Sequence, residues 1–385
     1  MRILHVIASA DPKHGGPIEG IKQLAVALAP LGVSVEVVSM DDPSASPWAA
    51  DFPLPFHPMG PGQGRFGRAP RMEAWLREHG KAYDRIVVNG LWQFNGLAVW
   101  RTRRDHGRPY YVFCHGMLDP WFRRTYPLKH LKKQLYWLVG QRGVLRDAAG
   151  VLYTCEEERV QAQRAFTPWG PFRERVVAYG TAGSPFDLDE ARRSFLTAFP
   201  SLEGTRNLLY LSRIHEKKGC DLLIRAFAKV APDHPDLRLV MAGPDQTGWG
   251  GELKDIAANE GVADRIVWTG MVKDELKWGA YAASEAFVLP SHQENFGIVV
   301  AEALSCSLPT LISNKVNIWR EIESDDAGIV AEDDQAGTDA LLDRWLALDA
   351  EERKTMRDAA VKCFRQRFEI GRAAAILRTI YEDTI

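Results

Sequence analysis

Two glutamates, Glu294 and Glu302, bracket an almost wholly apolar segment, and carboxylates at this spacing could contact a polar ligand at two points. The run "AFVLP" reads as a buried strand and "FGIVVAEALSC" as a buried helix, which puts Glu294 in the loop between them and Glu302 about two turns inside the helix. A helix rises about 1.5 Å per residue, so the eight residues from Glu294 to Glu302 would span about 12 Å. The paired acids of glycoside hydrolases are about 5 to 9.5 Å apart. We therefore interpret these two carboxylates as separate ligand-binding groups rather than as a catalytic pair.

The start of the same helix is a candidate anion site. The first backbone N–H groups of a helix lack intrahelical partners, and the helix dipole favours negative charge there. The N–H groups concerned belong to Phe296, Gly297 and Ile298. One segment could therefore hold three successive parts of an elongated ligand with an anionic centre.

Two cations follow a strand candidate in "SRIHEKKGCDLLIRAFAKV". Arg213 ends the strand and Lys218 comes five residues later, before an amphipathic helix. An arginine grips phosphate oxygens in a fork and a lysine adds a mobile charge, so the pair suits a diphosphate and the charge that develops on a leaving group. The alternative is an ordinary solvated basic loop.

A glycine pair precedes a helix in "HGGPIEG". Gly15 and Gly16 would let backbone N–H groups approach a phosphate at a helix start, or they form only a tight turn between strand and helix.

Another candidate follows the strand "YYVFC" in the stretch "CHGMLDPW". His115 at the end of that strand could contact a substrate hydroxyl or move a proton, and Asp119 is four residues further on. The alternative is a structural histidine with satisfied hydrogen bonds.

Short apolar runs alternate with helix-length segments in both halves of the chain, which is typical of parallel sheets covered by helices on both faces. Ligands in such sheets bind beyond the carboxyl ends of the strands, where the candidates above lie. Prolines and glycines gather in residues 165–206, so we place a domain boundary there, with a hinge near 180–185. Residues 40–71 are rich in Pro, Gly and Ser and are expected to form a long surface loop. The expected strands are "RILHVIA", "VSVEVVS", "DRIVVNG", "PYYVFCHG", "NLLYLSR", "LRLVMAGP", "RIVWTGMV", "EAFVLPS" and "LPTLISN".

Composition narrows the class of protein. The chain has 385 residues, which predicts about two domains. With 46% hydrophobic and 25% charged residues and a net charge of -2, it is typical of a globular protein and not of a nucleic-acid binder. The five cysteines form no C-x-x-C spacing, so no disulfide framework or zinc site is indicated and a cytoplasmic location is expected. The chain has no apolar run near the about 18 residues of a membrane span, and we interpret "MRILHVIASA" as a first strand.

Taken together, these motifs resemble the retaining glycosyltransferases of family four. The motifs that carry the resemblance best are "RIHEKKGCDLLIRAFA", "MAGPD" and the E-x7-E pattern of Glu294 and Glu302. The resemblance implies the GT-B fold, in which two Rossmann-like, doubly wound α/β domains face an interdomain cleft. It implies an acceptor-binding domain in residues 1–180, a nucleotide-sugar-binding domain in 185–365, and a C-terminal helix in 366–385 that packs back toward the first domain.

The resemblance also implies roles for single residues. Arg213 and Lys218 would hold the donor diphosphate, Glu294 the hydroxyls of the donor sugar, and Glu302 the ribose. His115 would lie near the transferred sugar, and with Arg213, Lys218 and Glu294 it makes up the expected catalytic set. The remaining donor-binding candidates are Gly15, Gly16, Gly243, Asn295, Phe296, Gly297 and Ile298, and the acceptor candidates are Trp92 and Asp119.

The implied reaction moves a hexose from a nucleotide diphosphate sugar to a hydroxyl, with a lipid-linked glycan or polysaccharide precursor as the expected acceptor. No metal or other cofactor is expected. In this family the departing phosphate is thought to accept the acceptor's proton, so a protein nucleophile is not needed. A GT-B nucleotide-sugar epimerase and a catalytically degenerate GT-B binding module are the alternatives.

Two further stretches bear on this interpretation. The D-x-D in "DLDE", residues 187–190, is a metal motif in another glycosyltransferase fold, but here it opens a helix, and we expect it to cap that helix. The interdomain turn, P-N-G-x-D in the family, reads "AYGTAG" at 178–183, which leaves the hinge geometry open.

Residues 121–142 carry six Lys or Arg, no acid and five aromatic residues. Leucines at helical spacing form an apolar stripe beside a basic face. Such a helix either lies on an anionic membrane, at the inner face of the cell membrane, or docks on its own domain with a solvated basic face. The stripe is formed by Leu128, Leu131, Leu135, Leu138 and Val139.

Overall fold

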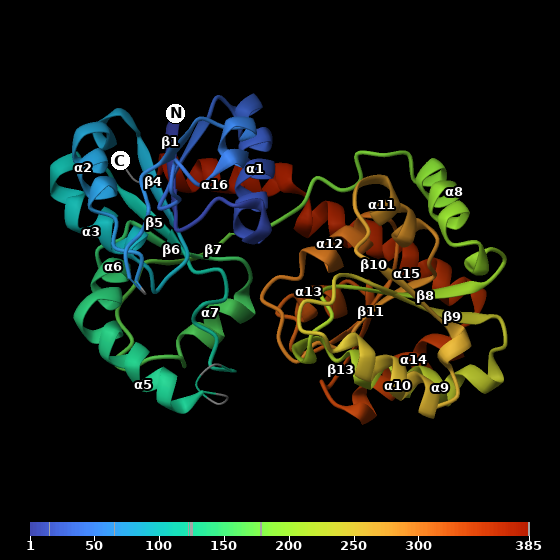
Figure 1. Cartoon of the computed structure of the whole chain (residues 1–385). Coiled ribbons are helices and arrows are strands. Elements are labelled where there is room, and N and C mark those ends of the chain that lie inside the picture. Colours follow the sequence, from blue (N-terminus) through green and yellow to red (C-terminus); the bar gives the residue numbers. More distant parts are fainter. Residues whose placement is uncertain (15, 65, 122, 124–125, 178, 384–385) are drawn as a thin grey trace. The chain divides into compact units, whose positions relative to one another are not determined.

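A computed structural model describes residues 1–14, 16–64, 66–121, 123, 126–177 and 179–383 (Figure 1). The chain divides into two compact units. The first unit is Met1–Gly180 together with the residues from Ile370 onward, and the second unit is Thr181–Glu369.

Among the described residues, the first unit holds a seven-stranded sheet in the order β3-β2-β1-β4-β5-β6-β7, with parallel neighbours. Its central strands are buried on both faces, which is why they read as continuous apolar runs. The strands are β1 (Arg2–Ile7), β2 (Ser34–Ser39), β3 (Phe56–Pro58), β4 (Arg85–Asn89), β5 (Tyr110–Phe113), β6 (Gly150–Tyr153) and β7 (Glu174–Val176).

Helices cover both faces of this sheet. Leu4 and Val6 of β1 pack into one core layer, and Ile3 and Ile7 pack into the other, as the two-residue period of a strand requires. The helices in the described part of the unit are α1 (Gly16–Leu28), α2 (Pro70–His79), α3 (Phe94–His106), α5 (Pro127–Tyr136), α6 (Arg142–Arg146), α7 (Glu156–Ala162) and α16 (Ile370–Glu382).

The last helix of the chain belongs to the first unit. In Figure 1, α16 lies beside α1 and the strands of this unit. Leu377 and Tyr381 are buried with α1 in the same core layer as Ile3. Arg85 of β4 also donates a hydrogen bond to the carbonyl of Tyr381 at 2.7 Å.

The expectation of one long surface loop over residues 40–71 was wrong in part. The segment contains a 3₁₀ helix at Pro47–Asp51 and the edge strand β3, which pairs with β2. β3 is only three residues long and ends in Pro58, which an edge strand tolerates because its outer side needs no ladder donor. Three other strands lay outside the expected set: β6, which begins at a glycine, β7, which is short and polar, and Gly328–Ala331 (β13) in the second unit.

The second unit repeats the plan with a six-stranded sheet, in the part of the chain that is described, in the order β10-β9-β8-β11-β12-β13. Its strands are β8 (Arg206–Leu211), β9 (Leu237–Ala242), β10 (Ile266–Gly270), β11 (Ala286–Leu289), β12 (Thr310–Ser313) and β13 (Gly328–Ala331). Its helices are α8 (Leu188–Ala198), α9 (Cys220–Val230), α10 (Gly250–Asn259), α11 (Asp274–Ala282), α12 (Ile298–Ser305), α13 (Trp319–Ser324), α14 (Gln335–Ala347) and α15 (Ala350–Cys363).

The strand orders place a switch point in each sheet. Successive strands run outward in opposite directions from the β1–β4 pair and from the β8–β11 pair. Ligands of open parallel sheets bind at such points, beyond the carboxyl ends of the strands. The loops after β1, β4, β8 and β11 are therefore the places where the topology predicts a site.

Candidate functional site

The loops after β8 and β11 are tied together at the switch point of the second unit. The backbone carbonyl of Lys217 accepts hydrogen bonds from the hydroxyl of Ser291 at 3.0 Å and from the N–H of His292 at 2.8 Å. Gly219 has φ 66°, and a Cβ placed on it would lie 2.3 Å from the carbonyl oxygen of Pro290. Only a glycine allows this approach of the two backbones, which brings Lys218 next to the loop that carries Glu294.

Lys218 and Glu294 form an ion pair across these two loops. The side chain of Lys218 is 9% exposed and that of Glu294 is 23% exposed. The Lys218 ammonium also lies 3.4 Å from the carbonyl oxygen of Gln293. The structure thus joins two residues that sequence reasoning assigned to neighbouring parts of one ligand.

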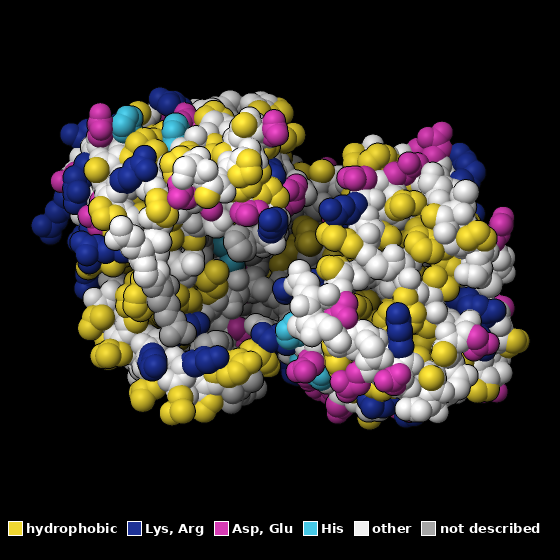
Figure 2. Space-filling model, viewed as in Figure 1, with side chains coloured by type: hydrophobic (Ala, Val, Ile, Leu, Met, Phe, Trp, Pro, Cys, Tyr) yellow, Lys and Arg dark blue, Asp and Glu magenta, His cyan; other side chains and the backbone are white. Residues whose placement is uncertain are grey.

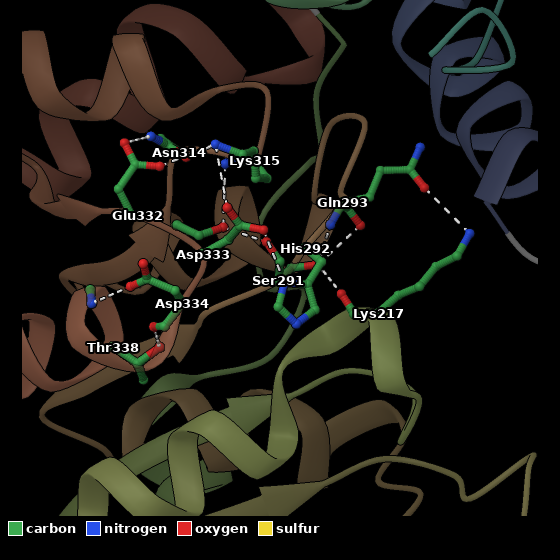
Figure 3. Close-up of polar contacts among 12 residues, drawn as sticks. Lys217, Ser291, His292, Gln293, Asn314, Lys315, Glu332, Asp333, Asp334 and Thr338 are labelled. Atoms are coloured by element: carbon green, nitrogen blue, oxygen red, sulfur yellow. Dashed lines mark hydrogen bonds and ion pairs between the residues drawn. The ribbon is translucent and has the colours of Figure 1, made fainter. Parts of the chain in front are cut away.

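A second layer of polar contacts holds the loop that carries Glu294 (Figure 3). His292 contacts Asp333 at 2.9 Å, and Lys315 contacts Asp333 at 3.4 Å. Burial opposes ionisation of Asp333, but His292 and Lys315 outweigh it and lower the pKa of that carboxyl. On the other side, the N–H of Glu294 donates to the carbonyl of Lys315 at 3.0 Å. These contacts fix the Glu294 backbone without using its carboxylate.

Helix α12 begins later than expected. Gly297 has φ 74° and forms the N-cap, and the helix starts at Ile298, so Glu302 lies about one turn inside it rather than two. Phe296 turns its ring into the core, 5.7 Å from the ring of Phe368, so its side chain is structural and only its backbone could meet a ligand. Asn295 lies in the loop between Glu294 and this N-cap.

Glu302 is buried and held by two donors from α11. The ammonium of Lys277 lies 2.8 Å from one carboxylate oxygen, and the hydroxyl of Tyr281 donates to the other at 3.0 Å. Burial, reinforced by Glu302, raises the pKa of Tyr281 well above its usual value, so this hydroxyl stays a donor. Sequence reasoning missed Lys277 and Tyr281, whose relation to Glu302 depends on the packing of α11 against α12.

Arg213 and Gly243 meet where β8 and β9 end. Arg213 is exposed, and its guanidinium lies 3.4 Å from the side-chain oxygen of Gln246. Gly243 has φ 142°, and a Cβ there would lie 1.8 Å from the carbonyl oxygen of Ser212. In this structure Gly243 therefore allows the "MAGPD" loop to approach the strand end from which Arg213 leaves.

In the first unit, His115 follows β5 in a left-handed conformation with φ 49°. Its Nε2 lies 3.2 Å from the Oδ1 of Asn89, the last residue of β4. Burial lowers the pKa of His115 to about 4, so its imidazole is neutral near pH 7. The turn after His115 is held by the buried Glu158, which accepts from the N–H of Gly116 at 2.6 Å and from the N–H and hydroxyl of Thr154 at 2.6 and 2.7 Å.

The other residues of this unit that the sequence suggested as ligand contacts have weaker support from the structure. Gly15 lies outside the described residues, and Gly16 is the exposed first residue of α1, where a Cβ would meet nothing within 4 Å. Trp92 packs against Phe166 at 4.9 Å between ring centroids, and its indole N–H donates to the carbonyl of Met117 at 3.1 Å. The carboxylate of Asp119 accepts from the N–H of Trp121 at 2.7 Å. Both acceptor candidates thus have structural contacts of their own.

A pocket of about 310 Å³ opens between the ends of β1 and β4. Its described lining includes the polar side chains of Ser9, Asn89 and Gln93, and Asn89 is also the partner of His115. The remaining lining residues are Ile7, Ala8, Pro17, Ile18, Gly90 and Met117.

The apolar stripe of α5 and of the π-helical turn that follows it, Trp137–Gln141, faces outward. Figure 2 shows hydrophobic side chains gathered over this helix, with Lys and Arg beside them. Within residues 126–142 the side chains of Trp137 and Gln141 are buried, and Trp137 stacks on Phe166 and Trp169. The segment thus docks on its own unit through Trp137 and not through its leucines. The exposed fractions of the stripe are 80% for Leu128, 67% for Leu131, 64% for Leu135, 52% for Leu138 and 72% for Val139.

Two other expectations concern metals and membranes. Asp187 caps α8, accepting from the N–H of Glu190 at 2.9 Å, so the expected capping role of "DLDE" is confirmed. The described residues contain no group of three or more metal-binding side chains. No helix among them combines the length and the apolar character that crossing a bilayer requires.

Comparison with known families shows to which family the chain belongs. Residues 15–193 match the glycosyl transferase 4-like domain, and residues 195–362 match the glycosyl transferases group 1. The chain therefore belongs to the group 1 glycosyltransferases, which confirms the family that its motifs resemble.

Curated relatives match over part of their length. The chain is 29% identical to an alpha-D-kanosaminyltransferase of Streptomyces kanamyceticus, over 63% of this chain and 62% of that protein. It is 27% identical to a D-inositol 3-phosphate glycosyltransferase of Actinosynnema mirum, over 77% of this chain and 75% of that protein.

Solved structures confirm the fold class. Sucrose-phosphate synthase from Thermosynechococcus elongatus superimposes with a TM-score of 0.77 at 20% identity, over 100% of this chain and 99% of that chain. Anabaena HepE in complex with UDP and glucose gives a TM-score of 0.75 at 17% identity, over 100% of both chains. The expected pair of Rossmann-like α/β units of the GT-B type is thus present.

Proposed function

We propose that this protein transfers a hexose from a nucleotide diphosphate sugar to a hydroxyl with retention of anomeric configuration and without a metal ion. The observation that carries the proposal is the meeting of Lys218, Glu294 and the start of α12 at the switch point of the second unit, with Glu302 one turn further on. The complex of HepE with UDP and glucose supports a nucleotide sugar as the donor class.

Each group at the switch point has one task in this reaction. The diphosphate draws the Lys218 ammonium away from Glu294 and lies at the N-terminus of α12, and Arg213 adds a second cation. Glu294, released from its ion pair, accepts hydrogen bonds from hydroxyls of the donor sugar. Glu302 keeps its contacts with Lys277 and Tyr281. Its remaining lone pairs accept hydrogen bonds from the ribose, since a carboxylate has about four acceptor sites.

The reaction needs no protein nucleophile. The bond between the anomeric carbon and the diphosphate oxygen breaks, and the acceptor oxygen bonds to the same face of that carbon. The departing phosphate takes the acceptor's proton. Lys218 and the helix N-terminus stabilise the negative charge that grows on the leaving group, which is the place where preorganised charge contributes most to rate.

Incubation with a panel of UDP, GDP and ADP sugars tests this function. Release of nucleoside diphosphate and the anomeric configuration of the product, both read by NMR, identify donor and stereochemistry, and activity should persist in EDTA. Glu294→Gln should abolish transfer, while the exposed Glu323→Gln should match wild type. Lys218→Ala should weaken nucleoside diphosphate binding, read by calorimetry. Equal turnover by Glu294→Gln and wild type would contradict the proposed site.

We further propose that the acceptor is a lipid-linked glycan or polysaccharide precursor, met at an anionic membrane surface. The exposed leucines of α5 support this, because a monomeric protein seldom leaves a contiguous apolar stripe in water. Lys129 and Lys132 lie on the same helix, and residues 121–142 contain no acid, so the flanking charge suits anionic headgroups.

Sedimentation with vesicles of phosphatidylglycerol and phosphatidylcholine in equal parts tests the membrane proposal. The protein should pellet at low salt and less so at high salt, because screening weakens the electrostatic part. Leu131→Glu with Leu135→Glu should abolish pelleting. Val26→Glu is the matched control, since Val26 is also an exposed apolar residue of an α-helix, at 74%, but belongs to α1. Pelleting of the double variant at the wild-type level would rule out this face.

A further inference from the structure

A chain of three polar side chains crosses the centre of the first sheet. His5 of β1 and Asn89 of β4 are buried, at 1% and 4% exposure, and His115 follows β5. Nδ1 of His5 lies 3.2 Å from Nδ2 of Asn89, and Nε2 of His115 lies 3.2 Å from Oδ1 of Asn89. One amide therefore joins two histidines at the switch point of this unit.

The amide determines which atom donates in each contact. Nδ2 of Asn89 lies 3.1 Å from the carbonyl oxygen of Val87, which can only accept, so this end of the amide is the donor end. Nδ2 then donates its second hydrogen to Nδ1 of His5, and the neutral His5 carries its proton on Nε2. Oδ1 can only accept, so His115 must carry a proton on Nε2. In neutral His115, Nδ1 is therefore left with a lone pair.

The surroundings keep both rings neutral. Burial lowers the pKa of His5 to about 3, with a further contribution from His115, and burial lowers the pKa of His115 to about 4. The His115 ring stacks on Phe113 at 5.3 Å and meets Tyr179 edge-on at 6.1 Å, so aromatic side chains hold its orientation. The Asn89 main chain is held in turn by the buried Asn95, whose amide donates to the Asn89 carbonyl at 3.0 Å.

We propose that Asn89 is a positioning residue, which locks His115 in the tautomer protonated on Nε2 so that Nδ1 accepts a hydrogen bond from a substrate hydroxyl. The hydroxyl is assigned to the transferred sugar, and that assignment alone rests on the proposed function. The other tautomer would present an N–H at this position, which would favour a phosphate or carbonyl oxygen. Asn89 thus makes the site selective for hydroxyl donors.

Long-range ¹H–¹⁵N spectra of the ¹⁵N-histidine-labelled full-length protein at pH 7 test the tautomer directly, without substrate. His115→Gln identifies the signals of His115 by their loss. Wild type should show His115 protonated on Nε2 only. A wild-type His115 that is charged or protonated on Nδ1 would overturn the proposal, whether or not any variant folds.

Variants of Asn89 test whether this residue fixes the tautomer of His115. Asn89→Leu cannot accept from Nε2, so His115 should become a mixture of tautomers, and kcat should fall about tenfold or more with little change in the donor KM. Asn89→Asp retains an acceptor and should keep the Nε2 proton. Gln93→Leu is the control, because Gln93 lines the same pocket and should leave the His115 signals unchanged.

The two proposals fail in different ways. If no sugar is transferred but the tautomer and its response to Asn89→Leu are as expected, the proposed function is wrong and the positioning role stands. If transfer occurs and Asn89→Leu leaves the His115 tautomer unchanged, the positioning role is wrong.

Discussion

At the scale of single residues, the three carboxylates of interest differ in what surrounds them. Glu294 faces one cation, Lys218, across two loops, so a ligand can take over either partner. Glu302 is held by Lys277 and Tyr281 on a neighbouring helix. Glu158 accepts three hydrogen bonds and supports the turn after His115. The exchangeable partner of Glu294 suits substrate binding, and the three hydrogen bonds to Glu158 suit a structural role, whereas Glu302 has two donors and keeps acceptor sites for a ligand.

The neutral histidines predict a loss of stability in acid. The folded-state pKa values of His5 and His115, about 3 and about 4, lie below the usual value of 6.5. The unfolded chain therefore binds more protons below about pH 6.5, and the free energy of unfolding should fall as pH drops toward 4, by at most about 1.4 kcal/mol per pH unit for each histidine.

Urea unfolding at pH 7.5 and pH 5 measures this effect. The loss between the two pH values should be smaller in His5→Asn than in wild type. His79→Gln is the control, since it replaces a histidine whose side chain is 47% exposed and outside the buried pair of His5 and Asn89. An equal loss in wild type and His5→Asn would contradict the expected linkage.

Some site residues were predictable from the sequence and others were not. Lys218 and Glu294 follow strands in recognisable motifs, so their place at a strand end could be read from the order of residues. Asn89 and Lys277 are single polar residues in segments that show no motif. Their roles depend on which strands and helices become neighbours, and tertiary pairing of this kind leaves no local signal.

At the scale of elements, glycines determine how closely the loops of the second unit approach one another. The loops after β8 and β11 touch at Gly219, and those after β8 and β9 touch at Gly243. The parallel order of the strands was foreseeable from the alternation of apolar runs and helices. The edge strands β3 and β7 could not be foreseen, because a strand of three residues is too short to show an alternation of apolar and polar residues.

Gly219→Ala should therefore damage both stability and binding. Its φ of 66° and the 2.3 Å approach to the Pro290 carbonyl leave no room for a Cβ, so unfolding should become easier by more than about 1 kcal/mol. The shift would also separate Lys218 from Glu294 and weaken binding of nucleoside diphosphate. Gly16→Ala meets nothing within 4 Å and should change stability by less than about 0.5 kcal/mol. Thermal unfolding and calorimetry with UDP compare the two, and equal stability of both variants would refute the packing argument.

At the scale of the whole molecule, the first unit depends on the end of the chain. Helix α16 supplies Leu377 and Tyr381 to the core beside α1, and the hydroxyl of Tyr111 in β5 donates to the carbonyl of Ile380 at 3.1 Å. The second unit is continuous in sequence, from Thr181 to Glu369.

Leu377→Ala should destabilise the first unit selectively. Removing a fully packed leucine side chain costs about 2 to 5 kcal/mol. Hydrogen exchange read by mass spectrometry should show faster exchange in β1, β4 and β5 and unchanged exchange in β8 and β11. Arg378→Ala, which removes only an exposed ion pair with Glu382, is the control. Uniformly faster exchange in both units would mean that the units unfold together.

The position of α16 also sets an order of assembly during synthesis. Domains usually complete their folding in the order in which they leave the ribosome. Here the second unit has its whole sequence once Glu369 has emerged, whereas the first unit, although made first, still awaits Ile370 onward. The apolar residues beside α1 must remain uncovered until α16 has been made, so the first unit completes its fold only after the second unit has its whole sequence.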